Sequence, residues 1–144
     1  MNIEQILDEW TKDCVVDKTE LADESLRTIS LHSKYIRLYK IEKLKLIKLL
    51  KEYPKLKLAK HEFYSMGPSK ETQELGWEMP ARGAVIKTEV DMYLQADQDI
   101  IDANLRISYA QEKADLLMDI VKEVNNRRWS IRAAIDFQKW IGGG

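Results

Sequence analysis

Basic and aromatic side chains are interleaved along residues 34–60. This stretch holds ten Lys or Arg residues and two Glu residues, so its net charge is +8, whereas the whole chain of 144 residues has a net charge of −1. Tyr35, Tyr39 and Tyr53 lie among the cations. Cations neutralise phosphates and aromatic faces stack on unpaired bases, and proteins that bind single strands use both. The residue types therefore favour binding of single-stranded DNA or another polyanion over the alternative, a solvated lysine face on a long helix.

Lysine supplies nine of these ten cations. A lysine acts as a point charge and not as a bidentate reader of guanine, so we expect contacts with the phosphate backbone and no sequence preference. Pro54 interrupts the stretch, and we place the contact zone at its end, from Lys48 to Tyr64. The predicted contacts with single-stranded DNA are Lys48, Lys51, Lys55, Lys57, Lys60, His61 and Tyr64.

A second basic group lies near the C-terminus together with three large aromatic residues, Trp129, Phe137 and Trp140. This group is a candidate for a second DNA contact or for a partner protein. The alternative is a terminal helix that packs through its tryptophans and carries basic residues near a helix end. The cations of this patch are Arg127, Arg128, Arg132 and Lys139.

No arrangement of residues indicates catalysis or metal binding. Asp97, Asp99 and Asp102 lack the Gly and Glu positions of a calcium loop, and we interpret them as exposed carboxylates at a helix start. His32 and His61 are too far apart in the sequence to form a zinc motif. We therefore predict no catalytic site, no metal, no cofactor and no enzymatic activity.

Helices must position the basic residues. Asn2 precedes Gln5 by three residues and Asp17 precedes Glu20 by three, which is the spacing of a capping box, so each pair predicts a helix start. Between Asp17 and Pro54 no Gly or Pro interrupts the chain. We expect a short first helix and then a long helix of roughly 35 residues, both within residues 2–53.

Residues 93–124 carry a regular apolar pattern. Apolar residues recur there at alternating spacings of three and four, which predicts a helix over 88–126 packed on another helix along its length. The pattern leaves open whether that other helix belongs to the same chain or to a second subunit. If it is intermolecular, the residues of assembly are Ile100, Ile107, Leu117, Val121 and Val124.

The rest of the chain completes a mainly helical fold. Residues 66–83 hold five of the nine Gly and Pro residues and predict a long loop, and a short basic helix is expected within 127–144. We predict a single helical domain over 1–144. Because the N-terminus is acidic, we predict no signal peptide, and because there is no long apolar run, we predict no membrane span. We therefore expect a cytoplasmic protein.

Several segments share their order and spacing with a known family. They are the pattern of Asp17, Thr19 and Leu21, the run from Leu58 to Ser65, the pair Lys87 and Thr88, the pattern of Leu94, Ala96, Asp97 and Asp99, and the run from Ser130 to Arg132. The chain resembles the UvsY recombination mediators of tailed phages related to the T-even group.

The resemblance implies a small helical protein that is not an enzyme and assembles into a ring of several subunits. It implies a protein that binds single-stranded DNA and helps a phage recombinase load onto strands coated by single-strand-binding protein, in the cytoplasm of the host cell. The DNA-contacting Lys and Arg of the family align with Leu58 and Lys60. Lys60 keeps the charge, and Lys55 or Lys57 is the local substitute for Leu58.

The predicted function is therefore a single-strand-binding recombination mediator. The alternative is a structural or chaperone-like helical oligomer whose lysines bind an acidic protein. A preference for single strands over duplex DNA separates the two, because only the mediator requires it.

Overall fold

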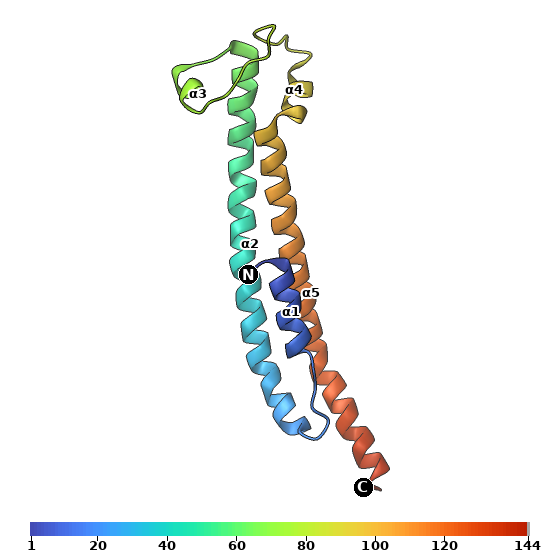
Figure 1. Ribbon diagram of the computed structural model, residues 1–144. Helices are drawn as coiled ribbons and strands as arrows, with labels where there is room; N and C mark the ends of the chain where they lie inside the picture. The colour runs from blue at the N-terminus through green and yellow to red at the C-terminus, as the bar shows by residue number, and fades with distance from the viewer. Residues whose placement is uncertain (144) are drawn as a thin grey trace. The chain divides into compact units, whose positions relative to one another are not determined.

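The chain is helical in the part that the structure describes, residues 1–143, and no β-strand occurs among these residues. The computed structural model contains α1 (Ile3–Asp13), α2 (Leu21–Met66), α3 (Lys70–Glu74), α4 (Val90–Ala96) and α5 (Gln98–Ile141) (Figure 1). The predicted mainly helical fold is confirmed.

The helices form two compact units. Unit 1 combines Met1–Leu44 with the chain from Ala110 onward, and unit 2 consists of Lys45–Tyr109. Each of the long helices α2 and α5 contributes residues to both units, because the unit boundaries fall inside these helices.

Unit 1 packs α1 against the first half of α2 and the second half of α5 (Figure 1). The ring of Trp10 on α1 meets that of Tyr35 on α2 edge to face, with centroids 5.4 Å apart. The buried core residues are Ile6, Leu31, Tyr35, Leu117, Ile120, Val121 and Val124.

The start of α1 is confirmed as predicted. The Asn2 side chain accepts a hydrogen bond from the Gln5 backbone N–H at 2.8 Å, and the Gln5 side chain accepts one from the Asn2 N–H at 2.9 Å. This reciprocal capping box satisfies two N–H groups that the first turn of a helix leaves without partners.

The bounds predicted for the long helix are wrong at both ends. Asp17 accepts from the backbone N–H and the hydroxyl of Thr19, so it closes a turn that precedes α2. The helix then continues through Pro54 and ends at Met66, before Gly67 with φ of 92°. Pro54 is exposed, so solvent can take the place of the backbone donor that proline lacks.

The helix predicted over 88–126 is also different in the structure. The chain breaks at Asp97, whose extended backbone separates α4 from α5, and α5 then runs without interruption past residue 127. The side chain of Asp97 accepts from the Ile100 N–H at 3.1 Å and so caps α5.

The apolar pattern of residues 93–124 packs within the chain. Leu117, Val121 and Val124 lie in the core of unit 1, and Ile100 is buried in unit 2. Ile107 is partly buried. Because Ile100, Leu117, Val121 and Val124 are buried within this chain, their prediction as residues of assembly is corrected to the intramolecular alternative, while that of Ile107 stays a prediction.

Unit 2 has a small aromatic core. Phe63, Tyr64, Val85, Val90 and Leu94 are buried, and Trp77, Met79 and Tyr93 pack against them. The predicted loop 66–83 contains the short helix α3, which starts with a capping box between Ser69 and Thr72. The segment between α2 and α4 is therefore anchored by Trp77 and Met79.

Candidate nucleic-acid interface

Three of the predicted lysines form a row on the exposed side of α2. Lys48, Lys51 and Lys55 follow one another at spacings of three and four, which place them on one face of a helix. The opposite face buries Leu46 and partly buries Tyr53, and this sets the orientation of the helix.

The row is available to a ligand. The Lys48 ammonium lies 4.0 Å from the Glu52 carboxylate, and both side chains are well exposed, so this pair is weak. Lys51 and Lys55 form no ion pair with any residue that the structure describes. Their positive charge is therefore not neutralised by an ion pair within residues 1–143.

The next two predicted contacts have a different environment. Lys57 is exposed, but at about 100° per residue it points to the opposite side of α2 from Lys55. His61 is only partly exposed. Neither extends the row.

Lys60 is not on the surface. Its ammonium lies 3.1 Å from the Asp97 carboxylate, 2.8 Å from that of Asp99 and 3.9 Å from the centre of the Trp77 ring. Its side chain is 5% exposed. The expectation of an exposed cation at this position is corrected, because two carboxylates and an indole ring already surround the charge of Lys60.

Tyr64 is also buried, so it offers no face for base stacking. Its hydroxyl donates to Asp97 at 2.5 Å, and burial together with this hydrogen bond raises the pKa of the phenol. Burial tends to raise the pKa of Asp97, but hydrogen bonds from Tyr64, from the Ile100 N–H and from Lys60 outweigh it and lower that pKa. Asp97 is thus a charged carboxylate inside unit 2.

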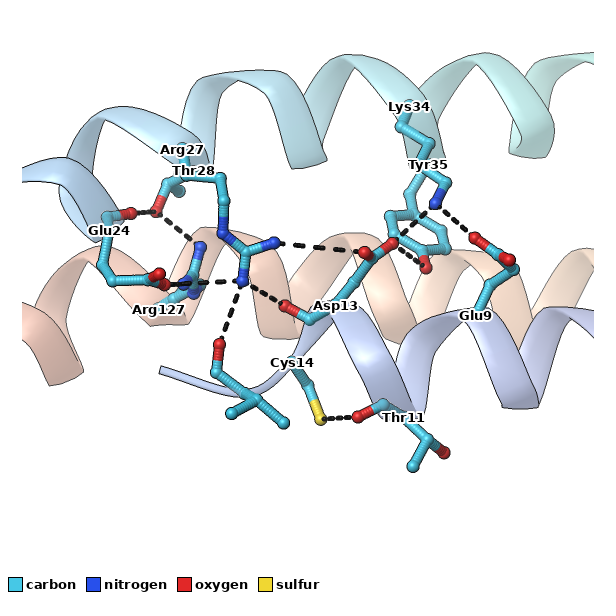
Figure 2. Close-up of polar contacts among 11 residues, drawn as sticks. Glu9, Thr11, Asp13, Cys14, Glu24, Arg27, Thr28, Lys34, Tyr35 and Arg127 are labelled. Carbon is cyan, nitrogen blue, oxygen red and sulfur yellow. Dashed lines mark hydrogen bonds and ion pairs between the residues drawn. The ribbon is translucent and has the colours of Figure 1, made fainter. Parts of the chain in front are cut away.

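The C-terminal patch loses one of its four cations. Arg127 is buried and pairs with Glu24, and it also donates to the Thr28 hydroxyl at 3.4 Å (Figure 2). Arg128, Arg132 and Lys139 are exposed. Arg127 therefore joins α5 to α2 within unit 1 and is corrected from a surface contact to a structural residue.

Lys34, at the start of the basic stretch, also serves the fold. Its ammonium donates to Glu9 and Asp13 on α1, each at 2.7 Å, and Asp13 also accepts from the Tyr35 hydroxyl at 2.8 Å (Figure 2). This cluster was not predicted from the sequence. Acidic Glu9 and Asp13 at a spacing of four on α1 were the available signal, since they share one face of that helix.

Among residues 1–143, no group of three or more His, Cys, Asp or Glu side chains is placed to hold a metal ion. None of the helices described is both long and apolar enough to cross a membrane.

Comparisons with known proteins give one consistent result. The family model described as "Recombination, repair and ssDNA binding protein UvsY" matches residues 9–144. No curated protein matches the chain.

Crystal structures of the bacteriophage T4 recombination mediator protein UvsY have a similar fold. The lattice type II structure superposes with a TM-score of 0.80 at 21% identity and covers 99% of this chain and 98% of that chain. The lattice type IV structure gives a TM-score of 0.79 at 18% identity, covering 97% and 98%. At this level of identity the likeness establishes the fold alone.

Proposed function

Because the chain belongs to the UvsY family of recombination, repair and ssDNA-binding proteins, we propose that it binds single strands through Lys48, Lys51 and Lys55. The observation that carries this proposal is the row of exposed lysines on α2. Residues 48 to 55 span about 10 Å of helix, so the three flexible side chains can reach neighbouring phosphates.

The surface beside the row is partly apolar. Ile47 and Leu58 are exposed apolar side chains of the same helix, with Leu58 60% exposed. Because neither side chain is an aromatic platform for base stacking, we expect the row to hold the strand through its phosphates. No bidentate reader of bases belongs to the row, which supports binding without sequence preference.

The role proposed for this binding is mediation and not catalysis. A strand held by its phosphates leaves its bases accessible to a RecA-like recombinase. In this proposal the protein helps that recombinase to load onto strands coated by single-strand-binding protein. One row of three lysines binds weakly. Several subunits acting on one strand would raise the avidity without new contacts.

Assembly of several subunits is part of the proposal. In unit 1, large apolar side chains remain on the surface of a single subunit, among them Leu26, Ile29 and Trp140. Leu26 and Ile29 line a groove of about 520 Å³ between α2 and α5. An aromatic helix end on one subunit and an apolar groove on the next are different surfaces, and head-to-tail contacts between different surfaces close into rings when the rotation permits.

The DNA proposal is tested with a triple variant, Lys48→Ala, Lys51→Ala and Lys55→Ala. Binding of a labelled oligonucleotide is measured over a series of salt concentrations. The slope of log affinity against log salt should become shallower by about 2, because each lost phosphate contact removes about 0.7.

A matched control removes three exposed lysines of unit 1, Lys12, Lys18 and Lys122. Its slope should stay close to that of the unaltered protein. Equal losses in both variants would mean a general charge effect, and an unchanged slope in the first would refute the site. Equal affinity for single strands and duplex would favour the alternative of an acidic protein partner.

A further inference from the structure

Lys60 joins three segments of unit 2. It lies on α2, and its ammonium contacts Asp97 between α4 and α5, Asp99 in the first turn of α5, and the ring of Trp77 between α3 and α4. A lysine is seldom buried unless its charge is paired. The ammonium of Lys60 forms ion pairs with two carboxylates and a cation–π contact with one ring.

Asp97 is the centre of this cluster. Its carboxylate accepts from Lys60, from the Tyr64 hydroxyl and from the Ile100 N–H. It therefore caps α5 and holds α2 at the same time. If Lys60 were removed, the buried carboxylate of Asp97 would lose its cation. Removal of one partner of a buried ion pair destabilises a protein more than replacement of both partners.

A phosphate would find an unfavourable setting at Lys60. Asp99 is 52% exposed beside the ammonium, so an approaching strand meets a carboxylate before it meets the cation. To reach the strand, Lys60 would have to leave both carboxylates and the Trp77 ring. The exposed row at Lys48, Lys51 and Lys55 requires no such rearrangement.

We infer that Lys60 is a positioning residue for DNA binding: through Asp97 it fixes the last turns of α2 against the start of α5 and so orients the exposed lysines of α2, but it does not touch the strand. This inference rests on the proposed function. It assigns different roles to two lysines only five residues apart: Lys55 contacts DNA, and Lys60 stabilises the fold of unit 2.

The test compares Lys60→Met, Asp97→Asn and the double variant. Lys60→Met should lower the melting temperature by about 10 °C, because it leaves a buried carboxylate unpaired. Below that melting temperature its affinity for an oligonucleotide should fall, while the slope of log affinity against log salt stays unchanged.

The double variant decides between contact and positioning. Asn at position 97 can still cap α5, and no unpaired buried charge remains. Both the melting temperature and the affinity should return close to those of the unaltered protein, although the lysine is absent. If the melting temperature returns and the affinity does not, Lys60 contacts the strand and the inference is wrong.

Two further outcomes also contradict it. One is a Lys60→Met variant whose melting temperature is unchanged and whose salt slope is shallower by about 0.7. The other is a double variant that does not fold, because a chain that lacks both charges has no unpaired buried charge and should tolerate the change.

Lys55→Ala serves as the matched control, with a shallower slope and an unchanged melting temperature. If Lys55→Ala leaves the slope unchanged, the proposed site on α2 fails, whatever Lys60 does.

Discussion

At the scale of single residues, charge type does not reveal the role of a lysine. Lys34 and Lys60 belong to the same basic stretch as Lys51, yet both are held by carboxylates from distant segments. In the Lys34 cluster, the pKa values of Asp13 and Lys34 both change in the direction that favours their charged forms. Burial tends to raise the pKa of Asp13, but hydrogen bonds from Lys34 and Tyr35 outweigh it and lower that pKa. Hydrogen bonds to Asp13 and Glu9 raise the pKa of Lys34.

We predict that Asp13→Asn lowers the free energy of unfolding by about 2 kcal/mol at neutral pH, because it removes charged hydrogen bonds between α1 and α2. The folded-state pKa of Asp13 lies below its usual value of 3.8. Its contribution is therefore complete above that pH and is lost as the pH falls through the folded-state pKa. Urea unfolding at several pH values measures the difference from the unaltered protein, which should shrink in acid.

Asp8→Asn is the control for this prediction. Asp8 is exposed on the same helix, so its loss should change stability little at any pH. A pH-independent deficit in Asp13→Asn would show that the change in shape, and not the charge, is responsible.

At the scale of elements, the local sequence predicts the start of α1 correctly but not the starts of α2 and α5. Asn2 starts α1 as expected, whereas Asp17 closes a turn and Asp97 starts α5 inside a continuous heptad pattern. Pro54 shows the opposite case, since α2 passes through a residue that normally ends a helix. Leu46 before Pro54 and Phe63 and Tyr64 after it are buried, so tertiary packing holds α2 on both sides of the proline.

Pro54→Ala should raise the free energy of unfolding by roughly 1–3 kcal/mol, since alanine restores the backbone donor to the Leu50 carbonyl and removes the ring from its path. Thermal or urea unfolding checks this value. Lys55→Ala, on the adjacent exposed position, is the control and should leave stability within about 0.5 kcal/mol. A loss of stability in Pro54→Ala would contradict this prediction and would mean that the restricted backbone of Pro54 favours the folded chain.

At the scale of the whole molecule, several large apolar side chains of the chain are exposed. Trp140 is 76% exposed, and its ring stacks on that of Phe137 with centroids 6.1 Å apart. Exposed apolar surface of this kind is typical of contacts with other proteins. These exposed side chains replace the buried heptad residues of α5 as the side chains proposed for assembly.

We predict that Phe137→Ala with Trp140→Ala shifts the solution mass toward the subunit mass of 16.8 kDa. Light scattering at micromolar concentration gives the mass of both proteins. Leu75→Ala, at an exposed apolar position of unit 2, is the control and should leave the mass unchanged. A mass of one subunit for the unaltered protein would refute the ring.

The sequence by itself determined the helical class, the α1 cap, the charge segregation and the family resemblance, because these depend on residue type and local spacing. It did not place Lys48, Lys51 and Lys55 on one face, because Pro54 predicted a long helix that ends at residue 53, whereas α2 continues to Met66. Only the tertiary structure decided that Lys60, Tyr64 and Arg127 are buried, that Leu117 and Val124 pack within the subunit, and that α5 begins at residue 98. The physical reason is that burial and ion pairing join residues far apart in the chain, as Lys60 to Asp97 and Arg127 to Glu24, and no local pattern encodes such partners.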